Sequence, residues 1–181
     1  MLYIVKYSGP FGFIKPWTAV RDEKTFSQQF LTPSIIEGLR QKLEVDSIIR
    51  HKLTYASISI HQEQTHPRAW EKKTQQRIMI RKRSIIKRGV MIDPILYLAF
   101  EKEKDALKSV KQHICLCRNE DVLFPDPKII LSDEKEFDQL AGFELRFGKS
   151  DKSFLVGFNR FEDAKPMYGW LDISGKPVTG M

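Results

Sequence analysis

Apolar and polar residues are arranged along the chain in a way that predicts a strand, a long loop, a helix and then mostly strands. Residues 2–7 are apolar and β-branched, as expected for a buried first strand. Residues 53–61 alternate with a period of two and predict a second strand. Residues 90–100 predict a third strand, in which Asp93 and Pro94 indicate a bulge or an edge position.

The segment at residues 30–43 has the apolar spacing of an amphipathic helix. Its start is predicted either at Thr32, with Pro33 as the first helical residue, or at a capping box formed by Ser34 and Glu37. Both alternatives place a helix between the first two strands.

Gly38 stands inside this predicted helix, where a glycine costs about 1 kcal/mol relative to alanine. We expect close packing against backbone to explain it. Residues 101–114 predict a second helix, because apolar residues follow one face and acidic residues stand in the first turn, where the helix dipole favours them. Residues 114–118 predict a fourth strand.

The predicted order of strand, helix, two strands, helix and strand is the ferredoxin-like arrangement. We therefore expect an α+β fold, with a ferredoxin-like, RRM-like core in residues 1–118. Residues 119–181 contain a proline-punctuated stretch, a short acidic helix and two further strands, and predict an appended β-rich lobe.

Length and composition fit one globular domain, because 181 residues with 41% apolar and 29% charged residues are enough to bury a sizeable core. The amino terminus lacks the pattern of a signal peptide, and no run of about 18 apolar residues predicts a membrane span. The two cysteines, Cys115 and Cys117, are read as small core residues of a reducing compartment. We expect a cytoplasmic protein without metal or cofactor.

Positive charge is concentrated in residues 65–89, a segment we call the basic window. It contains nine Lys and Arg against one acid, Glu71, and its net charge of +8 exceeds the +7 of the whole chain. One interpretation is a solvated face of a strand or hairpin, which is what most charge runs are. However, the cations are not interleaved with acids, and the window also holds apolar residues that would anchor a projecting hairpin.

Arginine-rich hairpins that carry an aromatic residue suit phosphate backbones and unstacked bases. Nucleic acid is therefore the predicted partner, ahead of an acidic protein surface or an anionic membrane. The expected contacts in the window are Arg68, Trp70, Lys72, Lys73, Arg77, Arg81, Lys82, Arg83, Lys87 and Arg88.

Two stretches of the first hundred residues resemble the CRISPR-associated Cas-five family of the RAMP superfamily. One is the Gly-Pro-aromatic loop followed by FLTPSIIEGL, and the other is KRGVMIDPILYLAF. The resemblance implies a ferredoxin-like core in a non-catalytic subunit of a multisubunit class 1 interference complex, of the Cascade-like kind. Such a subunit holds the 5′ handle of the CRISPR RNA and contacts a backbone subunit of the same superfamily. The resemblance leaves target DNA open as a further partner.

The basic window lies where this family commonly has a thumb-like insertion that grips RNA. The loop of residues 8–29 is rich in aromatic residues, and we expect Trp17 and Arg21 in it to contact RNA or a neighbouring subunit. Its apolar side chains should be covered in part by the core or by a partner. Lys149 stands in a predicted turn, because the spacing of the glycines around FGKS does not fit a phosphate-binding loop. We expect it to contact RNA phosphate.

The alternative function is a metal-independent endoribonuclease that processes precursor CRISPR RNA, since one branch of the family cleaves it. Such cleavage needs a general base, a general acid and a cation near the scissile phosphate. The residues of suitable chemistry fall in no recognisable catalytic arrangement, so the protein is predicted not to be an enzyme. These residues are His51 and His66 in predicted loops, His61 at a strand end, Tyr55, Lys72 and Lys73.

Overall fold

The computed structural model describes residues 1–16, 24–65, 70–73, 75, 78–81, 83–159 and 162–180. These parts contain fifteen strands and three short helices. Most of the regular structure is therefore β-sheet.

The largest sheet has nine strands among the described residues, in the order β10-β11-β1-β9-β4-β13-β15-β14, with β12 also paired to β1. Its pairings are antiparallel. The strands are β1 (Leu2–Ser8), β4 (Arg50–Thr54), β9 (Ile95–Phe100), β10 (Ile114–Cys115), β11 (Val122–Pro125), β12 (Ile130–Ser132), β13 (Gly142–Phe147), β14 (Phe154–Asn159) and β15 (Lys165–Ser174).

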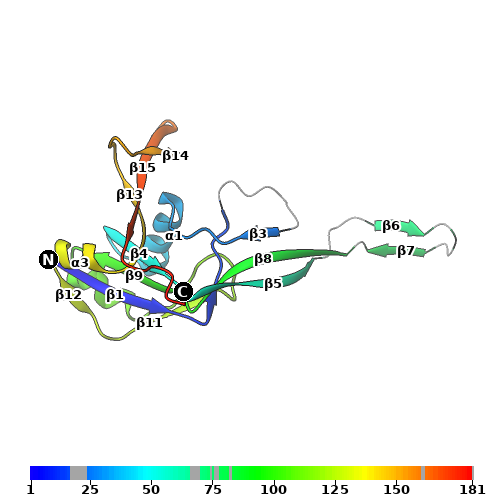
Figure 1. The fold of residues 1–181 in the computed structure, drawn as a ribbon, viewed down its shortest axis with the longest axis horizontal. Coiled ribbons are helices and arrows are strands. Elements are labelled where there is room, and N and C mark those ends of the chain that lie inside the picture. Colours follow the sequence, from blue (N-terminus) through cyan, green and yellow to red (C-terminus); the bar gives the residue numbers. More distant parts are fainter. Residues whose placement is uncertain are drawn as a thin grey trace.

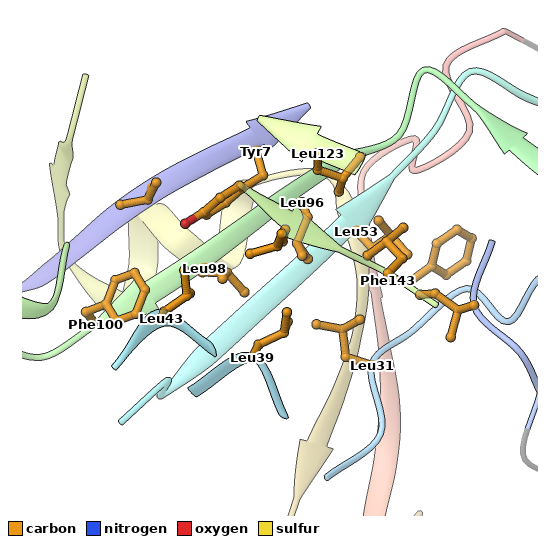
Figure 2. Packing of buried hydrophobic residues seen from close by; sticks show 14 of the residues in the cluster. Tyr7, Leu31, Leu39, Leu43, Leu53, Leu96, Leu98, Phe100, Leu123 and Phe143 are labelled. Atoms are coloured by element: carbon orange, nitrogen blue, oxygen red, sulfur yellow. The ribbon is translucent and has the colours of Figure 1, made fainter. Parts of the chain in front are cut away.

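Alternate residues of β1 are buried on opposite faces of this sheet. Val5 and Tyr7 belong to the main hydrophobic cluster, whereas Leu2 and Ile4 pack in a smaller cluster with Phe137 on the other face. Figure 2 shows Tyr7 in the main cluster, beside side chains from β4, β9 and α1. Because both faces of β1 are covered, its nearly continuous apolar sequence is explained.

Three helices pack near this sheet: α1 (Pro33–Leu43), α2 (Glu103–Ser109) and α3 (Glu134–Gln139). Thr32 is the N-cap residue of α1 and Pro33 its first helical residue, so the first of the two predicted starts is confirmed. The capping box is instead found in α3, where Asp133 and Glu136 exchange hydrogen bonds with each other's backbone. The packing explanation for Gly38 is wrong, because no described atom outside the helix backbone lies within 4 Å of a Cβ built there.

A second sheet has four strands, β2 (Phe11–Gly12), β3 (Lys24–Phe26), β5 (Ser57–Thr65) and β8 (Ser84–Ile92). Strands β5 and β8 form a long antiparallel ribbon that extends away from the body of the molecule (Figure 1). A separate strand pair, β6 (Trp70–Lys73) and β7 (Ile78–Arg81), lies beyond the outer end of that ribbon.

The prediction of an α+β ferredoxin-like fold is wrong, because the chain is mostly β and its main sheet has nine strands in the described residues. The strands expected in an appended lobe extend the main sheet instead, since β13 pairs with β4. The same sheet thus includes strands from both sides of the expected boundary between residues 118 and 119. Periodicity identified many of the strands but carried no information about which strands would be neighbours.

Two predicted strands are each divided where the chain passes from one sheet to the other. The strand expected at residues 53–61 ends at Thr54 and resumes at Ser57, and the strand expected at residues 90–100 turns at Asp93. Asp93 has a φ of 48°, which belongs to a turn and not to a strand.

The interpretation of the two cysteines as core residues is wrong, because Cys115 is half-buried and Cys117 is exposed. Among the described residues, no helix has both the length and the apolar character needed to cross a membrane.

Candidate nucleic-acid interface

The basic window forms most of the projecting part of the molecule, which we call the basic ribbon and define as β5, β6, β7 and β8. Strands β5 and β8 pair at nine consecutive positions, from Ser57 opposite Ile92 to Thr65 opposite Ser84. The outer strands, β6 and β7, pair with each other at four positions and form a separate two-stranded sheet. The sequence prediction of a projecting hairpin at this place agrees with this geometry (Figure 1).

The outer strand pair presents an aromatic residue beside a cation. Trp70 stands directly opposite Arg81, and the guanidinium carbon of Arg81 is 5.8 Å from the centre of the indole ring. Trp70 is 58% exposed, so a large part of its ring surface remains open. An exposed indole with a guanidinium at its face suits a base and its phosphate.

Apolar side chains of the basic ribbon are also exposed, among them Ile78, Met79 and Ile85. A two-stranded pair is marginally stable alone in water, because it has no core to cover such side chains. Five cations and two acids stand in the described residues of the ribbon, and a sixth cation, Arg83, comes directly before β8. The five cations are Lys72, Lys73, Arg81, Lys87 and Arg88, and the acids are Glu63 and Glu71.

Arg88 differs from the other cations, because its charge is engaged within the protein. Its Nε donates to Glu63 Oε2 at 2.6 Å, and its guanidinium carbon is 5.2 Å from the centre of the Phe13 ring. Phe13 is fully buried. This side chain therefore links the middle of the β5–β8 pair to the body through Phe13, and it is a poor candidate for an RNA contact.

Strand β3 adds two residues to this surface that the sequence prediction missed. It runs parallel to β8, and places Lys24 beside Lys87 and Phe26 beside Gly89. The sequence carried one signal, since a glycine inside a strand often marks the close approach of another group. That signal did not say which group approaches.

The other predicted contacts are placed as follows. Trp17, Arg21, Arg68, Arg77 and Lys82 lie outside the described residues. Lys149 lies between β13 and β14, where its Nζ is 5.3 Å from the centre of the Tyr168 ring. Figure 1 shows β13, β14 and β15 rising on a different side of the molecule from the basic ribbon. Lys149 is therefore separated from the other predicted contacts.

Two of the candidate catalytic residues, His51 and Tyr55, make hydrogen bonds within the protein. His51 lies in β4 and is buried, not in a loop as predicted, and its Nε2 accepts a hydrogen bond from Leu145 N–H at 3.4 Å. Burial, with the nearby charge of Arg50, lowers the pKa of His51 to about 3. The Tyr55 hydroxyl accepts a hydrogen bond from Gln29 Nε2 at 2.6 Å, and burial raises its pKa.

The remaining catalytic candidates do not converge in the part of the chain that the structure describes. His61 is half-buried in β5, where its ring meets the edge of Phe11 at 5.9 Å. Lys72 and Lys73 lie far from His51, in the outer pair of the basic ribbon (Figure 1). His66 lies outside the described residues. Within the described residues, no group of three or more side chains could hold a metal ion.

A cavity of about 220 Å³ is lined mostly by residues of β4 and β13. Its lining includes His51, Arg146, Phe147 and Trp170. Two of its charged lining residues pair with each other, because Arg50 donates to both carboxylate oxygens of Glu144. The cavity therefore offers fewer free polar groups than the basic ribbon.

The chain matches no protein-family model, and no curated protein matches it in sequence.

Proposed function

We propose that this protein is a non-catalytic RNA-binding subunit of a multisubunit class 1 CRISPR effector complex, and that it holds the 5′ handle of the guide RNA. The observation that carries the proposal is the basic ribbon, in which exposed cations and exposed Trp70 stand on two strands whose described residues are almost all exposed. The resemblance of FLTPSIIEGL and KRGVMIDPILYLAF to the Cas-five family supports the choice of RNA.

The proposed partners are CRISPR RNA and the neighbouring effector subunits, with target DNA as a further partner and the cytoplasm as the location. Exposed Ile78, Met79 and Ile85 support a role within an assembly, because a bound partner would remove them from water. The protein should be less soluble alone than with its complex.

The test is RNA binding by a variant of three exposed cations, two in β6 and one directly before β8. The RNA that co-purifies with the protein is sequenced and synthesised, and its affinity is measured at several salt concentrations. Replacing Lys72, Lys73 and Arg83 with alanine should weaken binding and lower the log–log salt slope by about 2, since each phosphate contact of a single strand contributes roughly 0.7. Folding should be nearly unchanged, because these side chains are exposed.

The matched control replaces three exposed lysines outside the ribbon, Lys111, Lys128 and Lys135. This control changes the net charge by the same amount and should leave the salt slope close to that of the wild type. Equal effects of the two triple variants, or none from either, would contradict the proposal.

The endoribonuclease is the second candidate, and the same RNA distinguishes it. We expect the RNA to remain intact with and without divalent metal ions. Site-specific cleavage that is lost on substitution of His51, His61 or His66 would establish the endoribonuclease instead.

A further inference from the structure

An exposed aromatic ring lies along the inner half of the basic ribbon, beside β8. Phe26, Gly89 and Ile60 are neighbours across β3, β8 and β5. Phe26 is 50% exposed and Ile60 is 45% exposed. The fully buried Phe13 lies in the same aromatic-rich loop region, so the exposure of Phe26 is specific to its position.

Gly89 gives the Phe26 ring its position. A Cβ built at Gly89 would lie 2.3 Å from Cδ1 of Phe26 and 2.9 Å from its Cε1, distances that real atoms do not adopt. The ring therefore occupies the space that any other side chain at position 89 would need. This contact fixes the ring against the β8 backbone while half of its surface stays open to solvent.

One cation lies next to this ring, and a second is the neighbour of the first across two strands. Lys24 Nζ is 5.0 Å from the centre of the Phe26 ring, and Lys24 is the direct neighbour of Lys87 across β3 and β8. Lys24 and Phe26 are two residues apart in one strand, so their side chains share a face. The surface therefore combines an open aromatic face with two ammonium groups.

We propose that Phe26 stacks one unpaired RNA base, and that Lys24 and Lys87 contact the phosphates beside that nucleotide. Sheet-surface aromatics recognise unstacked bases in this way, because every base has a flat face and is followed by a charged phosphate. An apolar protein surface would not account for the two lysines. The inference rests on the proposed RNA binding and adds a second contact point, distinct from Trp70 in the outer strand pair.

The experiment compares Phe26→Leu with Phe26→Tyr against the same synthetic RNA at several salt concentrations. Loss of one stacked base should weaken binding roughly 5- to 150-fold. Phe26→Leu should cause this loss without changing the salt slope, because leucine is apolar but has no flat ring. Phe26→Tyr keeps the ring and should bind nearly as the wild type does.

Gly89→Ala provides a second variant, since it displaces the ring without removing it and should also weaken binding. Thermal unfolding of each variant confirms that the protein remains folded. A 2-aminopurine placed at successive positions of the RNA should be quenched at one position by the wild type, and this quenching should be lost in Phe26→Leu.

The outcomes separate this inference from the proposed function. If Phe26→Leu binds RNA as the wild type does while the Lys72, Lys73 and Arg83 variant binds less tightly, the stacking site is refuted and RNA binding stands. If Phe26→Leu weakens only the association with other effector subunits, Phe26 is a protein contact and the inference falls. If the wild type does not bind the RNA, both proposals fall.

Discussion

Arg50 and Glu144 stand 94 positions apart in the sequence, and their side chains form a buried ion pair with two hydrogen bonds. Arg50 Nη2 is 2.7 Å from Glu144 Oε2, and Arg50 Nε is 2.5 Å from Oε1. The two side chains are 9% and 2% exposed. The pair joins β4 to β13, so it fastens the carboxy-terminal strands to the first half of the chain.

Arg50→Met should therefore lower the free energy of unfolding by about 3–5 kcal/mol, because it leaves the Glu144 carboxylate buried without its partner. Urea denaturation measures this change. The double variant Arg50→Met, Glu144→Leu should recover most of the loss, since the Glu144 carboxylate is no longer buried without its partner. The exposed pair of Lys102 and Asp46 is the control, and Lys102→Met should change stability little. An Arg50→Met variant as stable as the wild type would contradict the stabilising role of this ion pair.

His51 should make stability depend on pH in a range where carboxyl groups contribute little. Its pKa is about 3 in the folded protein and 6.5 ordinarily, so between these values the unfolded chain binds a proton that the folded chain does not. Stability is then complete above about pH 6.5 and falls as the pH is lowered. The slope should approach about 1.4 kcal/mol per pH unit near pH 5.

The measurement is urea denaturation at several values between pH 5 and 7. His51→Gln is the comparison, because its amide oxygen can still accept the Leu145 N–H hydrogen bond but does not titrate. The difference in stability between the two proteins should shrink or reverse in favour of the variant as the pH falls. Parallel pH profiles would show that His51 is not the responsible group.

Gly38→Ala should stabilise the protein by about 1 kcal/mol, because Gly38 lies inside α1 with open space around its Cβ position. Gly9→Ala is the contrasting variant. A Cβ at Gly9 would lie 2.3 Å from the carbonyl oxygen of Val122, so this change should destabilise. Thermal or urea unfolding tests both variants. A Gly38→Ala variant less stable than the wild type would contradict the open space found around this position.

Arg88 and Lys87 are neighbours in β8 and should respond differently to replacement by methionine. Arg88→Met should cost about 1–3 kcal/mol of stability, because it removes the bond to Glu63 and the packing on Phe13. Its effect on the salt slope of RNA binding should be small. Lys87→Met should leave stability nearly unchanged and lower that slope by about 0.7.

A lower salt slope for Arg88→Met, together with a loss of stability for Lys87→Met, would contradict these assignments. Arg88 would then be the RNA contact and Lys87 the structural residue.

Local sequence signals predicted the local features well. The apolar run of β1, the start of α1 at Thr32 and Pro33, and the hairpin in the basic window follow from spacing and charge over a few residues. These signals act within one element, so they can be read without knowledge of the rest of the chain.

Features that depend on distant residues were not predictable in this way. The pairing of β13 with β4 depends on segments about ninety residues apart, and alternation alone does not specify a partner strand. The exposure of Phe26 depends on Gly89, which lies in another strand. The break after Thr54 carries neither glycine nor proline, so the passage between sheets left no local signal.

The length of the β5–β8 pair contributes to the distance between Phe26, which lies beside the inner half of the pair, and Trp70, which lies beyond its outer end. An antiparallel strand advances about 3.4 Å per residue, and its side chains alternate between the two faces. Removing two residues from each of β5 and β8 therefore shortens this pair by about 7 Å and keeps its remaining side chains on their faces. Under the proposed function, such a step would change the number of nucleotides that fit between the two aromatic residues.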